Sequence, residues 1–344
     1  MIWVLVAGAA SLVIALAGTP LAAAYFRWRG LGQPIRDELQ ATHQAKTGTP
    51  TMGGTVIMLA AVIGYVVAHL GSVEVTTAGL VTLGAFAGMA VVGFGDDFLK
   101  LKMGRNLGLN KTAKFAGQTI VAALFAWIGP SYGSLPRNIS VVGDLAVDVS
   151  WWVFFLWVFL LLTGASNAVN LTDGLDGLVP GSAVLVFGAY TLIAFWQFRN
   201  HGDYPLGANE LLDIAIITAA VMMACVGFLW HNAPPARIIM GDTGSLALGA
   251  LLAAVAVATN TQLLLVAMGA LYVFETLSVI IQVAAFRTTG RRVFRIAPIH
   301  HHFEQIGWQE ATIIVRFWII AGIGIAIGLG LFYAEWAQRV GATP

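Results

Sequence analysis

Long apolar stretches alternate along the chain with short polar segments. A bilayer core of about 30 Å needs about 20 apolar residues in a helix, and ten stretches approach that length. Their approximate limits are 2–24, 53–70, 77–95, 113–130, 151–169, 179–197, 211–230, 243–259, 262–285 and 312–334. The pattern shows no repeat between the two halves and no separate polar domain, so it predicts an all-α polytopic membrane protein in which residues 1–344 form a single domain.

Arginine and lysine are distributed unequally over the two sides that these spans define. If the N-terminus lies outside, fifteen of the 18 basic residues fall in inner segments and three, Arg137, Arg199 and Arg339, fall in outer ones. Because Lys and Arg concentrate in cytoplasmic loops, this bias predicts both termini on the outer, periplasmic side. The arginines follow the first apolar stretch instead of preceding it, which favours a retained span over a cleaved signal peptide.

Composition excludes several functions. Only 10% of the residues are charged and the net charge is +1, so no overall basicity would recruit nucleic acid. The only cysteine, Cys225, lies in an apolar stretch, which excludes disulfides and thiolate metal sites and indicates a small buried side chain. The longest outer segment, around residues 130–150, is compatible with a small hairpin over the outer face.

Five aspartates lie at the inner ends of three spans: Asp96 and Asp97 in "GFGDDFLK", Asp173 and Asp176 in "NLTDGLDG", and Asp242 in "MGDTGS". Two adjacent carboxylates repel one another unless a cation or hydrogen-bond donors keep both ionised. Carboxylate oxygens suit Mg²⁺, which is commonly bound by one or two carboxylates together with substrate phosphates. The cluster therefore indicates a magnesium site for phosphate chemistry, with ordinary solvated loop residues as the alternative.

Cations and amides share this inner face. Lysines there could offset the charge that spreads over the oxygens of a transferring phosphoryl group; they are Lys46, Lys100, Lys111 and Lys114. Lys100 follows Asp97 by three residues, so on a helix it lies on the same face as the acids, either for catalysis or as a helix-end salt bridge. Asn167 and Asn170 could contact a nucleobase, a sugar or a metal-bound water.

Three consecutive histidines, His300, His301 and His302, follow Pro298. Their spacing does not suit a helical zinc site, and neither a cysteine cluster nor an HExxH motif supports one. Beside phosphates, histidines can donate hydrogen bonds or carry charge; spare imidazoles in a solvated loop are the alternative.

Four arginines precede the histidines, and one acid lies well inside a span. The arginine segment indicates an interfacial stretch for anionic lipid or substrate phosphate, or a plain topology determinant; it contains Arg287, Arg291, Arg292 and Arg295. The intramembrane acid, Glu275, is a candidate for function, but a packing role is equally compatible, and we leave it out of the predicted site.

Five segments occur in a characteristic order on one side of the ten spans: "KTGTPTMGG", "GFGDDFLK", "NAVNLTDGLDGL", "MGDTGSLALGA" and "PIHHHFE". Over about residues 25–335 the chain resembles the polyprenyl-phosphate N-acetylhexosamine-1-phosphate transferase superfamily. The resemblance implies a multi-pass enzyme of the bacterial cytoplasmic (inner) membrane, surrounded by lipid, that uses Mg²⁺. The implied reaction moves phospho-MurNAc-pentapeptide from UDP-MurNAc-pentapeptide to undecaprenyl phosphate, giving lipid I and UMP for peptidoglycan. It leaves a homodimer open.

The same resemblance implies roles for residues. It makes Asp96 and Asp97 the paired acids and Asp242 the chief Mg²⁺ ligand. The expected catalytic residues are Asp96, Asp97, Lys100, Lys111, Asp242 and His300. The expected substrate-binding residues are Lys46, Thr51, Lys114, Asn167, Asn170, Asp173, Asp176, Asn232, His301 and His302. One departure from the family pattern is Ile239, where many members have phenylalanine.

The expected mechanism starts from a lipid phosphate that is mostly ionised at pH 7, since the second pKa of a phosphomonoester is about 6. We expect it to attack the β-phosphorus of the donor directly, with Asp97 positioning the acceptor or taking up a residual proton. A covalent aspartyl-phosphate route stays open.

Two other functions are compatible with the sequence. One is transfer of GlcNAc-1-phosphate from UDP-GlcNAc to the same lipid, against which the uninterrupted "HHHFE" argues. The other is a cation or phosphate transporter. Transporters place ion sites near the midplane between repeated halves, whereas these acids lie at one edge.

Overall fold

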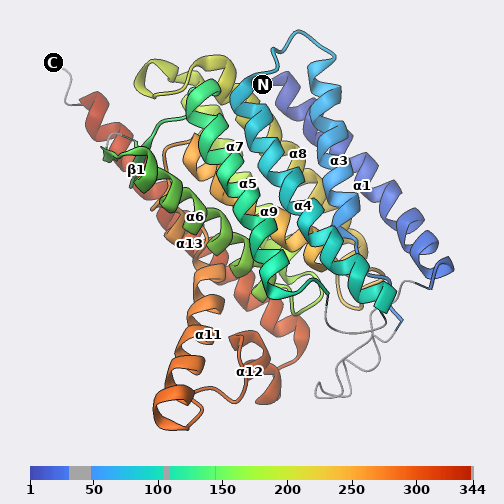
Figure 1. The fold of residues 1–344 in the computed structure, drawn as a ribbon. Coiled ribbons are helices and arrows are strands. Elements are labelled where there is room, and N and C mark those ends of the chain that lie inside the picture. Colours follow the sequence, from blue (N-terminus) through green and yellow to red (C-terminus); the bar gives the residue numbers. More distant parts are fainter. Residues whose placement is uncertain (31–47, 104–107, 144, 342–344) are drawn as a thin grey trace.

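The computed structural model describes residues 1–30, 48–103, 108–143 and 145–341, which form a bundle of α-helices (Figure 1). Lys46 therefore lies outside the described residues. The helices are α1 (Ile2–Trp28), α3 (Gly54–His69), α4 (Thr77–Met103), α5 (Lys111–Tyr132), α6 (Trp151–Thr172), α7 (Leu178–Arg199), the 3₁₀ turn η1 (His201–Asp203), α8 (Ala208–Asn232), α9 (Gly241–Ala258), α10 (Leu265–Met268), α11 (Ala270–Thr289), α12 (Ile299–Gln305) and α13 (Glu310–Gly341). Two short strands are β1 (Asn138–Ser140) and β2 (Ala146–Asp148).

Seven of the described helices are long and apolar enough to cross a membrane, namely α1, α4, α6, α7, α8, α11 and α13. Two shorter apolar helices, α3 and α9, lie among them. Each of the ten predicted stretches overlaps a helix, but the stretch 262–285 is interrupted at Gly269, between α10 and α11. The all-α membrane fold that the apolar pattern predicts is thus present.

The strands β1 and β2 pair antiparallel and form the hairpin that the sequence allowed. The hairpin is tied to the chain that follows α9. The amide Nε2 of Gln262 donates to the carbonyl oxygen of Asn138 at 3.1 Å, and Leu263 N donates to Ser140 O at 2.9 Å. These polar contacts occupy the residues between α9 and α10, so a continuous helix does not start at residue 262.

The helices α8 and α9 form the centre of the bundle. Every side chain of α9 from Thr243 to Ala258 is buried, mainly against α4 and α6, while α8 packs between α1, α3 and α7. Small residues dominate α9, and small residues allow helix backbones to approach closely in membranes. Cys225 in α8 is fully buried, which confirms its predicted role as a small core residue.

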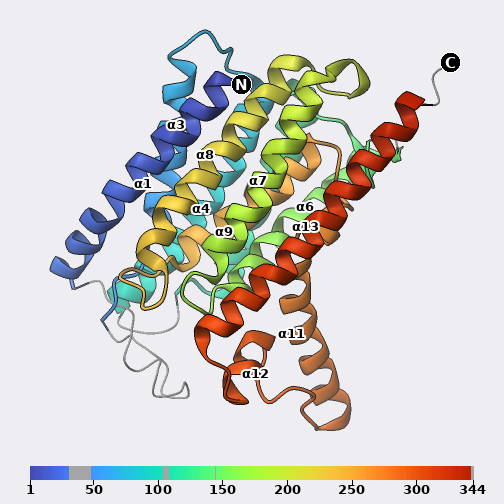
Figure 2. The same ribbon diagram turned by 180° about the vertical axis from the view of Figure 1, so that it is seen from behind.

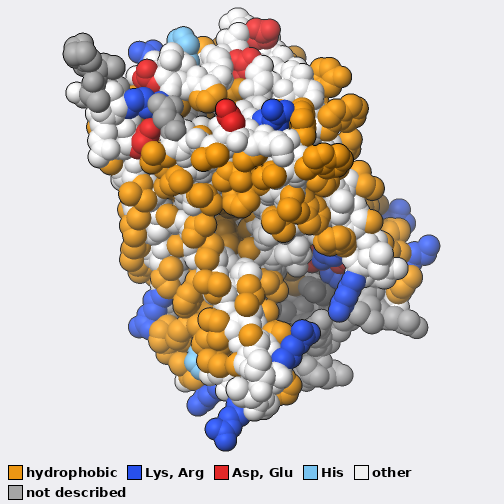
Figure 3. Space-filling view, turned by 60° about the vertical axis from the view of Figure 1, so that its left-hand side comes forward, with side chains coloured by type: hydrophobic (Ala, Val, Ile, Leu, Met, Phe, Trp, Pro, Cys, Tyr) orange, Lys and Arg blue, Asp and Glu red, His pale blue; other side chains and the backbone are white. Residues whose placement is uncertain are grey.

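The ends of the bundle differ in what they carry. The start of α1 and the end of α13 lie at the same end, and the C-terminal end of α4, the start of α5 and α12 lie at the opposite end (Figures 1 and 2). On the face in Figure 3, apolar side chains form a belt, with charged side chains above and below it. The belt is the surface that a bilayer core would cover.

Candidate active site

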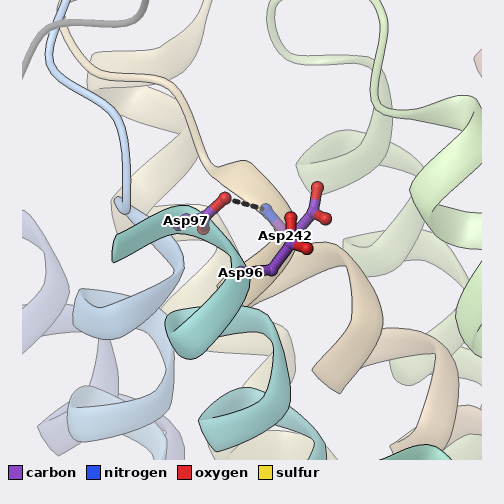
Figure 4. A group of neighbouring side chains, drawn as sticks. All are labelled: Asp96, Asp97 and Asp242. Atoms are coloured by element: carbon purple, nitrogen blue, oxygen red, sulfur yellow. Dashed lines mark hydrogen bonds between the residues drawn. The ribbon is translucent and has the colours of Figure 1, made fainter. Parts of the chain in front are cut away.

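Three carboxylates from two helices meet at the end of the bundle that carries α12. Asp96 and Asp97 belong to α4 and Asp242 to the first turn of α9, and one oxygen of each lies within 4.8 Å of the others (Figure 4). The approach of α4 to α9 depends on Gly93, where a Cβ atom would lie 2.2 Å from the carbonyl oxygen of Asp242. A glycine one turn before the paired acids therefore brings them to Asp242.

Asp97 accepts hydrogen bonds from the N-terminus of α9. Its Oδ1 accepts from Asp242 N at 3.1 Å, and its Oδ2 accepts from Thr243 N at 2.9 Å and from Thr243 Oγ1 at 2.7 Å. The first N–H groups of a helix have no partner within the helix and carry partial positive charge. Asp97 thus caps α9 from a neighbouring helix and fixes the backbone of Asp242.

Two lysines balance the remaining charge. Lys100 Nζ lies 2.6 Å from Asp96 Oδ2 and 3.1 Å from Asp242 Oδ2, and Lys114 Nζ, from α5, lies 2.6 Å from the same Asp242 oxygen. Three carboxylates and two ammonium groups leave a formal charge of −1. Such a site can accept a cation together with an anionic substrate. The sequence placed both lysines among the site residues, and the structure brings both to Asp242.

The end of α6 adds an amide to this cluster. Asn170 Nδ2 donates to Asp242 Oδ1 at 2.9 Å and to Ser245 Oγ at 2.8 Å. Asn167, almost one turn earlier, donates to Thr163 O at 2.7 Å and does not contact the carboxylates in the part of the chain that the structure describes. Of the two predicted asparagines, Asn170 is therefore the one that reaches the acids.

Asp173 follows α6 and is partly buried beside the cluster. Its burial, together with the nearby carboxylates of Asp242 and Asp97, raises the pKa of Asp173 well above the usual range of an aspartate. A cation bound near these acids would remove part of that repulsion, so the pKa of Asp173 would fall when the site holds a cation.

Two predicted substrate-binding residues hold the loop 173–177 in place. Asp176 Oδ2 accepts from Ala236 N at 3.0 Å, and the Asp176 backbone N–H donates to Glu310 Oε1 at 3.2 Å. Asn232 accepts from Gly177 N at 2.9 Å through Oδ1 and donates to Ile238 O at 2.8 Å through Nδ2. These contacts join the loop 173–177 to the segment between α8 and α9.

The histidines of α12 have three different environments. His300 is completely buried, and its Nδ1 lies 3.0 Å from Oε2 of Glu275, which is also completely buried. His301 is paired with Glu304 of the same short helix. His302 Nδ1 accepts a hydrogen bond from the Arg295 backbone N–H at 3.2 Å. The rings of His300 and His301 contact one another, with centroids 4.1 Å apart, but the three imidazoles have different polar partners.

Two further predicted residues, Thr51 and Lys111, differ in burial. Thr51 is buried, and a Cβ atom on Gly241 would lie 3.0 Å from its hydroxyl oxygen, so Thr51 is close to the start of α9. Lys111 is exposed at the first position of α5 and forms no ion pair with any described residue.

The site predicted from the sequence left out four polar residues. Thr243 and Ser245 follow Asp242 within the motif "MGDTGS", and their place in the first turn of a helix was a usable signal. Glu275 was recognised as an intramembrane acid, but its partner was not identified. Glu310 begins α13, and nothing in the sequence indicated that it meets the loop 173–177.

The carboxylate cluster could hold a metal ion. Asp242 and Asp96 offer oxygens that only lysines and single hydrogen-bond donors contact, whereas both Asp97 oxygens accept from α9. An oxygen-only donor set with few carboxylates suits Mg²⁺ better than Zn²⁺. The residues present therefore fit a magnesium ion.

This arrangement defines a membrane-embedded enzyme with a polar reaction centre at one end of a helical bundle. Residues 77–260, more than half of the chain, match the family profile described as glycosyl transferase family 4. Three relatives are similar over nearly their whole length. The protein from Frankia alni is 50% identical, with 98% of each chain covered. That from Saccharopolyspora erythraea is 48% identical, with 97% of each covered. That from Corynebacterium diphtheriae is 45% identical, with 99% of this chain and 100% of the relative covered. All three are named phospho-N-acetylmuramoyl-pentapeptide-transferase, and the chain belongs to this family.

Proposed function

We propose that the chain is a bacterial cytoplasmic-membrane enzyme that transfers phospho-N-acetylmuramoyl-pentapeptide from UDP-MurNAc-pentapeptide to undecaprenyl phosphate, forming lipid I and UMP in peptidoglycan synthesis. Relatives of that name, 45–50% identical over nearly the full length, support this activity over transfer of GlcNAc-1-phosphate. The observation that carries the chemistry is the group of three carboxylates and two lysines around Asp242.

We infer that Asp242, with Asp96 beside it, holds Mg²⁺. When bound there, the ion offsets charge on the diphosphate of the donor. Asn170 fixes one oxygen of Asp242, and Asp97 fixes its backbone, so the metal ligand is held from two sides. Supporting groups of this kind orient a ligand before the substrate arrives.

In the proposed reaction, an oxygen of the lipid phosphate attacks the β-phosphorus of the donor. A new phosphorus–oxygen bond forms, the bond between the β-phosphorus and the bridging oxygen breaks, and that oxygen leaves with UMP. Lys100 and Lys114, both within 3.1 Å of Asp242, lie where they can neutralise the charge on the transferring oxygens. Since both oxygens of Asp97 accept from α9, we assign Asp97 to holding Asp242 instead of attacking phosphorus.

Binding of the two substrates is proposed from the surroundings of the cluster. The loop 173–177, together with Asn170 near the end of α6, would contact the nucleotide, as the family resemblance implies for Asn170, Asp173 and Asp176. A cavity of about 280 Å³ between α6 and the α10–α11 segment is almost wholly apolar, and its walls include Leu160, Val266 and Leu277. Such a lining suits a polyprenyl chain.

The proposed topology has ten spans, with both termini outside and the reaction centre facing the cytoplasm. A cytoplasmic centre is where a soluble UDP-linked sugar would arrive, and a membrane-embedded bundle is where a polyprenyl lipid would arrive. The site at the end of the bundle would let both substrates reach Asp242.

The test is purified protein with undecaprenyl phosphate, UDP-MurNAc-pentapeptide and Mg²⁺, assayed for UMP. We expect turnover by the parent, a loss of at least about 100-fold in Asp242→Asn, as for loss of a group acting on the transition state, and no turnover when EDTA replaces Mg²⁺. Asp148→Asn, an exposed aspartate in β2, is the matched control and should keep parental turnover. A parent that is inactive with this donor but active with UDP-GlcNAc would contradict the proposed activity, and an unimpaired Asp242→Asn would remove Asp242 from the metal site.

A further inference from the structure

A carboxylate and an imidazole are buried together outside the aspartate cluster. Glu275 of α11 and His300 of α12 both have no exposed surface, and His300 Nδ1 lies 3.0 Å from Glu275 Oε2. The carboxylate oxygens of Glu275 and the ring nitrogens of His300 form no hydrogen bond with any described residue, so this 3.0 Å contact is the polar contact that each side chain has among those residues. Because removing one member of a buried polar pair leaves the other unsatisfied, each of these residues depends on the other.

The Nε2 edge of the imidazole ring lies against the loop 173–177. A Cβ atom on Gly174 would lie 2.2 Å from His300 Nε2 and 2.9 Å from its Cε1. Only a glycine therefore leaves room for His300 at this place. Gly174 directly follows Asp173, and on its other side the loop is fastened through Asp176 and Asn232.

A completely buried His300 cannot touch a substrate in this structure. Its ring instead lies beside Glu275 at Nδ1 and Gly174 at Nε2, and it contacts the ring of His301. We infer that Glu275 is a positioning residue that orients the ring of His300. His300 in turn packs against Gly174 and holds the loop 173–177 in the conformation that binds the nucleotide of the donor. This inference rests on the proposed function.

The geometry predicts a specific kinetic effect. Loss of the pair would loosen one side of the loop 173–177 and leave Asp242, Lys100 and Lys114 in place, since none of these three contacts Glu275 or His300 among the described residues. Binding of the donor should therefore weaken more than the chemical step. Supporting partners of this kind commonly change affinity by about 10–100-fold.

The experiment measures kcat and KM for each substrate in Glu275→Ala, Glu275→Asp, Gly174→Ala and the double variant Glu275→Ala with Gly174→Ala. We expect KM for UDP-MurNAc-pentapeptide to rise about tenfold or more in Glu275→Ala and Gly174→Ala, while KM for undecaprenyl phosphate and kcat stay within about twofold. Glu275→Asp should recover part of the donor affinity. The effects in the double variant should be less than additive, because both changes act through His300. Thr288→Ala, an exposed change near the end of α11, is the control.

Several results would overturn this inference. They are a fall in kcat with an unchanged donor KM, a rise in KM for both substrates, or full additivity in the double variant. Should Glu275→Ala not fold, as judged by thermal unfolding, Glu275→Asp decides, since it keeps the carboxylate and alters only its position beside His300: a raised donor KM supports the inference and an unchanged donor KM contradicts it. An inactive parent would contradict the proposed function, whereas an active parent with unchanged variants would contradict only the role of Glu275.

Discussion

The adjacent aspartates of α4 have different partners. Both carboxylate oxygens of Asp97 accept hydrogen bonds from the N-terminus of α9. Asp96 accepts a hydrogen bond from Leu109 N at 3.0 Å through Oδ1, and its Oδ2 is paired with Lys100. The sequence predicted that a cation or hydrogen-bond donors would lie near the pair, and it placed Lys100 on the same helix face as the two acids. It could not divide the roles of the two acids, because that division depends on which of them faces the first turn of a helix 145 residues further along the chain.

The raised pKa of Asp173 predicts a dependence of stability on pH. Burial and the neighbouring acids disfavour the carboxylate form in the folded protein, so its folded pKa exceeds its unfolded value. The free energy of unfolding therefore has its full value below the unfolded pKa of Asp173. It falls as the pH rises through the folded pKa, because the folded protein must then bury a charged carboxylate. Asp173→Asn, which cannot ionise, should melt at a higher temperature than the parent at pH 8 and at a similar temperature near pH 4.

This prediction is checked by thermal unfolding in detergent with EDTA at a series of pH values. Asp148→Asn, which is exposed on β2, should follow the parent throughout. If the difference between Asp173→Asn and the parent does not grow with rising pH, the carboxyl group of Asp173 is not held against ionisation by its surroundings.

At the scale of elements, the helices themselves were predictable from apolar length, but their contacts were not. The stretch 243–259 is rich in small residues, yet α9 is the most completely buried helix described. Small side chains weaken a hydropathy signal and at the same time permit close helix packing. The start of the following helical segment, α10, at Leu265 instead of residue 262 was not predictable either, since it follows from the contacts of Gln262 and Leu263 with the hairpin.

The helices α3, α4 and α8 are joined at the end opposite the active site by another buried acid. Asp213 Oδ2 accepts from Thr76 N at 2.9 Å, from Thr76 Oγ1 at 2.7 Å and from the Tyr65 hydroxyl at 3.2 Å. The Thr76 hydroxyl also accepts from Gly79 N at 3.0 Å and so caps the start of α4. The Thr76 hydroxyl group thus caps α4 and at the same time donates a hydrogen bond to the buried carboxylate of Asp213.

Thr76→Val should therefore destabilise the bundle strongly for a single conservative change. Loss of a cap costs about 1 kcal/mol, and loss of a hydrogen bond to a buried carboxylate adds about 1.5–3 kcal/mol. The neighbouring Thr77→Val is a matched control, because Thr77 is exposed at the first position of α4. Thermal unfolding in detergent should rank Thr76→Val well below Thr77→Val and the parent; equal melting temperatures would mean that the Thr76 hydroxyl contributes nothing to the junction of these helices.

At the scale of the whole molecule, the active site and the described ends of the chain lie at opposite ends of the bundle (Figures 1 and 2). The proposed function requires the site to face the cytoplasm, because the UDP-linked donor is soluble there. The distribution of basic residues predicts this orientation from sequence alone.

A labelling experiment checks the orientation directly. Cys225 is the only cysteine and is fully buried, so a Cys225→Ala background permits single cysteines to be placed at each end. Ser72→Cys lies in the exposed turn between α3 and α4, and Thr288→Cys lies at the exposed end of α11. In sealed right-side-out vesicles, a membrane-impermeant maleimide should label Ser72→Cys at once and Thr288→Cys only after permeabilisation, because the bilayer separates the two positions. The opposite pattern would place Asp242 outside the cell, away from its donor, and the proposed function would then fail together with the topology; labelling of both positions in sealed vesicles would show that α11 does not carry its end to the far side.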